Sequence, residues 1–158
     1  MRKALVVGGA SGIGLAIATQ LAAREDYAAI HIVDRAQVPE DMVHEKFECH
    51  LFDLTSQDYG FFDRFMDIDT LMITAGFGHL ALFKDLSEDY IINMMNVNAV
   101  AVMRLIRRFY DRIASSDDFY CGVMVSIAGF MSSPFFSVYG ASKAALKIFI
   151  ESVNVELE

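Results

Sequence analysis

The chain has 158 residues, 54% of them hydrophobic, and a formal charge of −8 from 13 basic and 21 acidic side chains. This length and composition predict one folded domain over residues 1–158 and exclude a disordered chain. The acidic balance disfavours nucleic acid and anionic membranes as partners, and two cysteines are too few for a disulfide-rich secreted scaffold. The first apolar run stops at Gly8, too short for a signal peptide, and no run has the length of a membrane span, so we expect a cytoplasmic protein.

Short apolar runs alternate along the chain with longer segments of helical periodicity. The expected strands are Lys3–Val7, Ala29–Asp34, Phe47–Leu51, Leu71–Thr74 and Gly122–Ser126. The expected helices are Gly12–Arg24, Ser56–Met66, a long stretch from Ser87 to about Ile113, and Phe136–Leu157. In the first helix, Ile13, Ala16, Ile17 and Leu21 are expected on one face. Such alternation is typical of βαβ units, so the pattern predicts an α/β fold with a parallel sheet covered on both faces.

A glycine-rich turn, Gly8-Gly9-Ala10-Ser11-Gly12-Ile13-Gly14, joins the first strand to the first helix. Glycines let the backbone turn sharply and approach a pyrophosphate, whose charge the helix N-terminus favours. On its own, the turn is also typical of an ordinary tight strand-to-helix connection.

An acidic residue, Asp34, ends the second expected strand 20 residues after Gly14. A carboxylate there can accept hydrogen bonds from both ribose hydroxyls of NAD and would repel the extra phosphate of NADP. The neighbouring Arg35 favours NADP, but Asp34 and the non-basic Ser11 weigh against it, so we expect NAD and regard NADP as the second choice.

Tyr139 and Lys143 are four residues apart in the last expected helix, so they share one helix face. A nearby cation favours the tyrosinate, so the pair can donate a proton to a carbonyl or remove one from an alcohol. Alone, this spacing also occurs on ordinary helix surfaces.

These motifs occur in order with Asp53-Leu54, Ala75-Gly76, Asn98 and Ser126. Together they resemble the short-chain dehydrogenase/reductase family in its compact branch, over essentially the whole chain. The resemblance implies a Rossmann-like, doubly wound parallel sheet in three αβα layers. It also implies an oxidoreductase that transfers a hydride between NAD(H) and a small-molecule carbonyl or secondary alcohol.

The resemblance implies a role for each matching residue. Tyr139 would be the general acid/base, Lys143 would lower its pKa and hold the nicotinamide ribose, and Ser126 would hydrogen-bond the reacting oxygen. Asn98 would support a water relay to the lysine, and Asp53 would contact the adenine. The expected cofactor-binding residues are Gly8, Ala10, Ser11, Gly12, Ile13, Gly14, Asp34, Arg35, Asp53, Leu54, Ala75, Gly76, Tyr139 and Lys143.

Two departures from the family pattern stand out. Gly8 occupies a position where the family usually has Thr, and Ile73-Thr74 stands where the family usually has Asn-Asn. The hydrogen bonds with which those side chains brace the cofactor loops are therefore expected to be lost. Thr74 is expected to replace one of them in part. The chain also stops before the family's usual last strands and substrate lid. We favour a truncated product or an incomplete sequence over a short protein completed by association.

Other interpretations stay open: a non-catalytic dinucleotide-binding or regulatory module, an inactive fragment of a dehydrogenase, or epimerisation or dehydration on the same scaffold. No histidine or cysteine pair has metal-ligand spacing, so the sequence predicts no metal site. His31 is expected to be structural, and His79 is a weaker candidate for facing substrate. An apolar surface predicts a homo-oligomer; its residues are Met94, Met95, Val97, Val102, Met103 and Ile106.

Overall fold

The computed structural model describes all 158 residues, Met1–Glu158. Its strands are β1 (Arg2–Val7), β2 (Tyr27–Asp34), β3 (Phe47–Leu51), β4 (Thr70–Ile73) and β5 (Tyr120–Val123). Its α-helices are α1 (Gly12–Ala22), α2 (Glu88–Met95), α3 (Ala101–Ser115) and α4 (Ser137–Glu156). Shorter helical turns are η1 (Glu40–Met42), η2 (Tyr59–Phe65), η3 (Phe83–Asp85), η4 (Asn96–Val100) and η5 (Ile127–Gly129). None of the helices combines the length and hydropathy that a membrane crossing requires.

The chain divides into two compact units. The sheet unit comprises Met1–Ala75 and Phe109–Met124, and the helical unit comprises Gly76–Arg108 and Val125–Glu158. The expectation of a single domain over residues 1–158 stays a prediction.

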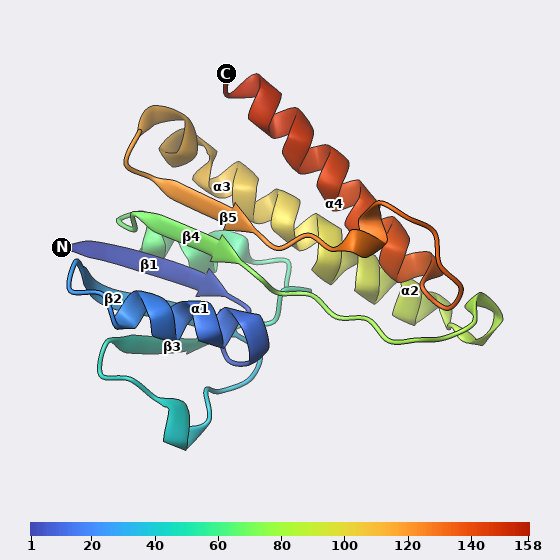
Figure 1. The fold of residues 1–158 in the computed structure, drawn as a ribbon, viewed down its shortest axis with the longest axis horizontal. Coiled ribbons are helices and arrows are strands. Elements are labelled where there is room, and N and C mark those ends of the chain that lie inside the picture. Colours follow the sequence, from blue (N-terminus) through green and yellow to red (C-terminus); the bar gives the residue numbers. More distant parts are fainter. The chain divides into compact units, whose positions relative to one another are not determined.

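All five strands of the sheet unit are parallel and are ordered β3-β2-β1-β4-β5 (Figure 1). The expected Rossmann-like α/β fold is therefore confirmed. After β3 the chain returns to the other side of β1, so the strand order reverses between β1 and β4. Val7 is paired with Val33 on one side and with Ile73 on the other. In open α/β sheets, ligands bind outside the carboxyl ends of the strands at this switch point.

The core of the sheet unit is built on β1, whose residues Ala4, Leu5, Val6 and Val7 are fully buried. A strand covered on both faces needs such a continuous apolar run rather than an alternating one. Helix α1 lies over β1 and β2 (Figure 1). It contributes a buried set, namely Gly14, Leu15, Ala18 and Ala22.

The face of α1 that carries Ile13, Ala16, Ile17 and Leu21 is not the buried one. Ile13 is 59% exposed, Ala16 is exposed as well, and Ile17 and Leu21 are half-buried. A Cβ on Gly14 would lie 2.1 Å from the carbonyl oxygen of Gly8. Since only glycine permits this approach, the helix turns Gly14, and with it Ala18 and Ala22 at four-residue intervals, toward the sheet.

The segment expected as a helix over Ser56–Met66 is shorter and of a different type: η2 is a 3-10 helix. Its main buried side chains, Phe62 and Phe65, are 0% and 1% exposed. They are three residues apart, the repeat of a 3-10 turn, so this geometry points both rings into the core. The carboxylate of Asp58 accepts a hydrogen bond from the Gly60 N–H and fixes the start of the turn.

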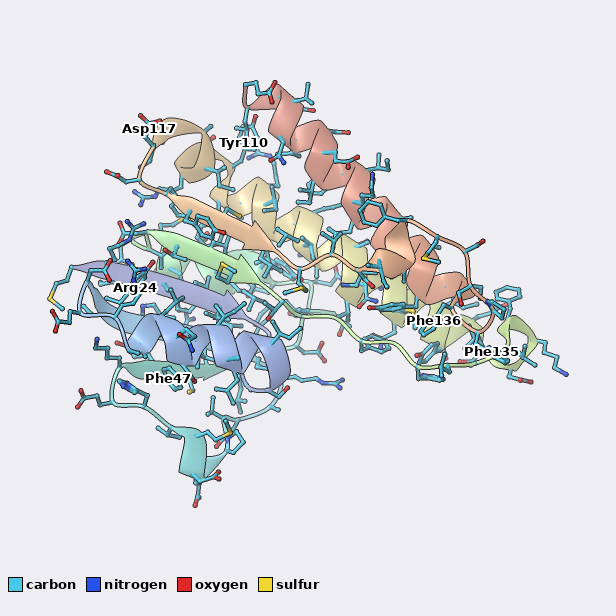
Figure 2. All side chains as sticks on the ribbon, viewed as in Figure 1. Arg24, Phe47, Tyr110, Asp117, Phe135 and Phe136 are labelled. Carbon is cyan, nitrogen blue, oxygen red and sulfur yellow. The ribbon has the colours of Figure 1, made fainter.

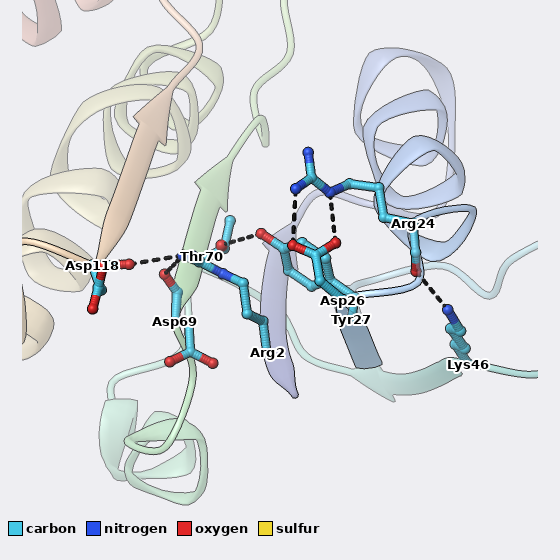
Figure 3. A network of polar contacts seen from close by, with 8 residues as sticks. All are labelled: Arg2, Arg24, Asp26, Tyr27, Lys46, Asp69, Thr70 and Asp118. Carbon is cyan, nitrogen blue, oxygen red and sulfur yellow. Dashed lines mark hydrogen bonds and ion pairs between the residues drawn. The ribbon is translucent and has the colours of Figure 1, made fainter.

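A network of polar contacts connects residues at the amino ends of the strands (Figure 3). The Arg2 guanidinium donates to the carbonyls of Asp69 and Asp118, at 3.3 and 2.7 Å, and so ties together the loops that precede β4 and β5. The hydroxyls of Tyr27 and Thr70 are 2.6 Å apart. The carboxyl ends of the same strands carry the glycine-rich turn instead.

In the helical unit, α2, the π turn η4 and the first part of α3 form an unbroken run, as the sequence predicts for Ser87 onward. The Ser87 side chain caps it by accepting a hydrogen bond from the Tyr90 N–H. The expected association surface on this run is wrong in part. Three of its members are 1–3% exposed and so are buried within the chain itself, namely Met94, Val102 and Ile106.

Candidate active site

The glycine-rich turn leaves β1 at the switch point of the sheet unit. Gly8 has a φ of +85°, a conformation that favours glycine, and a Cβ there would lie 2.5 Å from the Ala75 nitrogen. The threonine that the family pattern places at this position would therefore collide with the chain after β4. The Thr74 hydroxyl lies 3.1 Å from the carbonyl oxygens of both Val7 and Gly8, to which it donates. Thr74 thus braces the turn from the opposite side.

The N-terminus of α1 is open to a ligand. Ser11 makes no side-chain capping bond, and the first turn carries no acidic residue. Ser11, Gly12 and Ile13 are all exposed. Free N–H groups and the positive end of the helix dipole suit a phosphate or pyrophosphate there.

Asp34, at the carboxyl end of β2, is bonded to the same turn. Its Oδ2 accepts a hydrogen bond from the Ala10 N–H at 3.0 Å, and its Oδ1 accepts one from the Ala36 N–H at 3.1 Å. Each carboxylate oxygen can accept more than one hydrogen bond, so Asp34 can brace the turn and still receive a ribose hydroxyl. The neighbouring Arg35 is exposed.

Asp53 follows β3 on the same edge of the sheet. Its Oδ1 accepts hydrogen bonds from the Thr55 N–H at 2.9 Å and the Thr55 hydroxyl at 2.8 Å. These bonds hold the pKa of the Asp53 carboxyl below its usual range. The adjacent Leu54 carbonyl accepts a hydrogen bond from the Tyr59 hydroxyl at 2.8 Å. Asp53 therefore orders the loop after β3, and the carboxylate is exposed to solvent.

The four expected catalytic residues all lie in the helical unit. Asn98 is fully buried in the π turn η4, a kind of distortion that is frequent at functional sites. Its side chain clasps the backbone of Phe77, accepting from the Phe77 N–H at 2.9 Å and donating to the Phe77 carbonyl at 2.8 Å. The same amide donates to the Ser142 hydroxyl at 3.1 Å.

Lys143, on α4, is only 4% exposed. Burial lowers the pKa of its ammonium group. A Cβ on Gly76 would lie 3.2 Å from the Lys143 Nζ and 3.2 Å from the Asn98 Oδ1. Gly76, Asn98 and Lys143 therefore lie close together. The Lys143 Nζ is 5.9 Å from the centre of the Tyr139 ring.

The ring of Tyr139 packs against the loop that follows Gly76. A Cβ on Gly78 would lie 2.4 Å from the Tyr139 Cδ2, so the loop contacts the ring directly. On another side lies Phe136, whose ring centre is 5.7 Å from that of Tyr139. Figure 2 labels Phe136 and Phe135 in the loop before α4. Phe135 has a φ of +68°, an unfavourable value for a bulky side chain.

Ser126 lies in the turn after β5 rather than in the strand, which ends at Val123 and not at Ser126 as expected. Its Oγ accepts a hydrogen bond from the Ala128 N–H at 3.2 Å and so starts the turn η5. That turn packs on α4, because a Cβ on Gly129 would lie 2.7 Å from the Lys143 carbonyl oxygen. Ser126 is thus held at the level of α4 that carries Lys143.

Two residues that the sequence analysis did not select take part in this arrangement. The buried Ser142 hydroxyl donates to the Tyr139 carbonyl at 2.7 Å and accepts from Asn98, so it links the two elements. Gly78 supplies the flat surface for the Tyr139 ring. The position of Ser142, one turn after Tyr139, is a signal in the sequence, whereas nothing in the sequence marks Gly78. His79 is hydrogen-bonded to the Tyr90 hydroxyl, and its contact with substrate stays a prediction.

The chain is similar to proteins of known sequence. An uncharacterized short-chain type dehydrogenase/reductase of Sinorhizobium fredii is 34% identical over 161 residues, which cover 98% of this chain and 63% of that protein. The 17-beta-hydroxysteroid dehydrogenase type 1 of Homo sapiens is 34% identical over 90 residues, 57% of this chain and 27% of that protein. The chain therefore spans less than two thirds of the length of these relatives.

Solved structures of similar fold cover 99% of the chain. The bulky-bulky ketone specific alcohol dehydrogenase from Comamonas testosteroni matches with a TM-score of 0.87, 25% identity and 68% of its own length. A 3-oxoacyl-[acyl-carrier protein] reductase from Brucella melitensis, in complex with NAD, matches with a TM-score of 0.80 and 28% identity, over 68% of its own length. An alcohol dehydrogenase from Thermococcus sibiricus, complexed with 5-hydroxy-NADP, matches with a TM-score of 0.84 and 25% identity, over 71% of its own length.

The sequence model of the short chain dehydrogenase family matches residues 2–158. This match covers nearly the whole chain, including the glycine-rich turn at the switch point and the helix that carries Tyr139 and Lys143. The chain belongs to the short chain dehydrogenase family.

Proposed function

We propose that the protein is an NAD(H)-dependent oxidoreductase that interconverts a carbonyl and a secondary alcohol, with Tyr139 as the general acid/base. The observation that carries this proposal is the buried Lys143 ammonium, one helical turn from Tyr139 and 5.9 Å from the centre of its ring. An ammonium group is rarely buried without a function for its charge, and stabilising a tyrosinate is such a function.

The proton chemistry follows from the residues of the helical unit. The Tyr139 hydroxyl donates its proton to the carbonyl oxygen as negative charge develops there, and in the alcohol-to-carbonyl direction the tyrosinate takes the proton back. Lys143 stabilises the tyrosinate electrostatically, and low exposure strengthens the attraction. The Ser126 oxygen accepts from Ala128, which leaves its own proton free for the reacting oxygen.

A nicotinamide cofactor, when bound, supplies or accepts the hydride. The sheet unit offers residues that fit its nucleotide part. The open N-terminus of α1 suits the pyrophosphate, since Gly14 allows close packing of the helix on β1. Asp34 would accept the ribose hydroxyls, and its negative charge is the reason to propose NAD rather than NADP. The relatives of known structure include complexes with NAD and with 5-hydroxy-NADP, so the family itself does not decide between them.

The decisive experiment is Tyr139→Phe in the natural full-length gene product, assayed with a panel of ketones and secondary alcohols. The substitution removes the hydroxyl and keeps the ring that packs on Gly78. We expect turnover to fall by about 10²–10⁴-fold, the contribution typical of a general acid, while NADH binding changes by less than about threefold. The matched control is Tyr120→Phe, on the 59% exposed Tyr120 of β5, which should change neither quantity.

Equal losses of turnover and NADH binding would contradict the acid/base role, and so would undiminished turnover. One further outcome favours a different function. If the wild-type protein binds NADH but converts none of the substrates, a non-catalytic dinucleotide-binding module is the better interpretation.

A further inference from the structure

The sheet unit holds a second group of chemistry-bearing side chains, on β2 and β3. His31 of β2 is paired in register with Glu48 of β3, and Val33 is paired with His50. Paired residues of neighbouring parallel strands project to the same face, and so do residues two apart on one strand. His31, Glu48 and His50 therefore converge on one face of the sheet, and their candidate ligand atoms all lie within 4.8 Å of one another.

We propose that this His31–Glu48–His50 cluster binds a divalent transition metal ion, Zn²⁺ in the first place, through two imidazole nitrogens and one carboxylate. The His31 Nδ1 is 3.2 Å from the Glu48 Oε2. Two ligand atoms at 2.0–2.1 Å from a tetrahedral ion are about 3.3 Å apart. Two of the three ligands thus already have the spacing that such an ion requires.

The hydrogen-bonding state of the two imidazoles also favours a ligand. The His31 Nδ1 and the His50 Nε2 are both buried, and neither makes a hydrogen bond. Buried polar atoms without a partner are uncommon and call for an explanation. The neighbouring Glu48 carboxylate would account for the first atom, but it leaves the His50 Nε2 without a partner. One metal ion between them satisfies both.

The surroundings of the cluster hold the ligands in place and leave it accessible. The ring centres of His31 and His50 are each 5.1 Å from that of Phe65 on η2, and this contact restricts both imidazoles. Restricted ligands bind a metal with a smaller loss of conformational freedom. The Glu48 side chain is 57% exposed, so an ion can reach the cluster from solvent.

Neighbouring cations are engaged elsewhere. Lys3 of β1 forms an ion pair with Asp67. Arg64 of η2 donates to the Phe61 carbonyl at 2.9 Å and lies over the Phe61 ring at 4.2 Å. Glu48 is therefore available as the anionic ligand that complements a divalent ion.

Strand geometry explains why the spacing of histidines in the sequence does not reveal this cluster. His31 and His50 are 19 positions apart and meet only through the register of β2 with β3. Cys49 lies between the two β3 ligands in the chain, but alternation along the strand directs it to the opposite face. The proposal therefore excludes Cys49 as a ligand.

The test is titration of the full-length, metal-free protein with Zn²⁺ in competition with a chromophoric chelator, supported by Co²⁺ absorption spectra. We expect one ion per chain. Glu48→Gln keeps the size of an exposed side chain and should weaken Zn²⁺ binding at least about tenfold, as should His50→Asn. The matched controls are His44→Asn and Cys49→Ser, for which we expect Zn²⁺ binding within about twofold of wild type.

A second readout follows protein stability. Zn²⁺ should raise the thermal midpoint of the wild-type protein, and Glu48→Gln should lose most of that rise while its metal-free midpoint stays close to wild type. The proposal is overturned if no saturable single-ion binding is found, if Glu48→Gln binds Zn²⁺ as tightly as wild type, or if Cys49→Ser abolishes binding. Should His50→Asn fail to fold, Glu48→Gln decides, because its exposed carboxylate makes no contribution to the core.

Discussion

At the scale of single residues, Lys143 is expected to affect both the pH dependence of the protein's stability and the proton transfer proposed for Tyr139. Its side chain is 4% exposed, and burial lowers the pKa of its ammonium group. The folded state therefore releases the lysine proton at a lower pH than the unfolded chain does. Between those two pKa values the unfolded chain binds more protons, so the free energy of unfolding rises with pH there.

Replacing this lysine should remove that pH dependence. We expect Lys143→Met to lose turnover, and the stability of the wild-type protein relative to the variant should increase as pH rises toward 10.5, the ordinary pKa of lysine. Urea unfolding of both proteins at several pH values between 7 and the ordinary lysine pKa measures the difference. The matched control is Lys147→Met, one turn further along α4, where the lysine forms an exposed ion pair with Glu151. A pH dependence that is the same for Lys143→Met and wild type would contradict the assignment.

Single residues also show what the sequence predicts about the site. The family motifs identify Asn98, Tyr139 and Lys143, and the structure places Asn98 and Lys143 against Gly76. The two hydrogen bonds between the Asn98 side chain and the Phe77 backbone could not be predicted from the sequence, because Phe77 lies in a loop of irregular backbone. Thr74 was expected to replace a lost brace only in part, and it reaches two carbonyls of the glycine-rich turn.

At the scale of elements, α1 shows that one close approach can orient a whole helix. Apolar periodicity groups Ile13 with Ala16, Ile17 and Leu21 on one face, but the contact of Gly14 with the Gly8 carbonyl sets the rotation of the helix and buries a different face. The bounds of β1, β2 and β4 agree with the expected ones to within two residues, because their buried apolar runs stand out in the sequence. β3 matches its expected bounds of Phe47–Leu51 although none of its residues is fully buried, whereas β5 ends three residues earlier than expected. The type of η2 was not predicted, since three- and four-residue spacings both fit a short aromatic segment.

The glycines of the first turn provide a test at this scale. Gly14→Ala should lower the free energy of unfolding by about 3 kcal/mol or more, because its Cβ would lie 2.1 Å from backbone. Gly12→Ala is the matched control. Gly12 has a φ of +54°, and a Cβ added there would have no atom within 4 Å, so alanine should lose only about 1–2 kcal/mol through backbone strain. Urea denaturation measures both, and equal losses would contradict the close-packing explanation.

At the scale of the whole molecule, the chemistry-bearing residues are divided between the two units. The glycine-rich turn, Asp34 and Asp53 belong to the sheet unit, and the four expected catalytic residues belong to the helical unit. The sheet has two edge strands, β3, which pairs with β2 alone, and β5, which pairs with β4 alone. The parallel pairing of the strands was predictable from the alternating elements, whereas the division into units depends on contacts remote in sequence.

Cofactor binding provides the test at this scale. A ligand at about 100 times its Kd stabilises a protein by about 2.7 kcal/mol, so saturating NADH should raise the thermal midpoint by about 5–10 °C. NADPH at the same concentration should produce a much smaller rise, since the Asp34 carboxylate repels its extra phosphate. Scanning calorimetry with each nucleotide measures both shifts. Equal shifts would contradict the preference for NAD, and Asp34→Asn should bring the two nucleotides closer together.

The π turn at Asn96–Val100 has a consequence for how the family can change by insertion and deletion. Each residue advances an α-helix by about 100°, so deleting one residue there would straighten the run and rotate all of α3 about its axis. Leu105 and Phe109, both fully buried, would then turn toward solvent. The residue count of the run from α2 to α3 is therefore constrained, because the one extra residue at the π turn sets which side chains of α3 are buried.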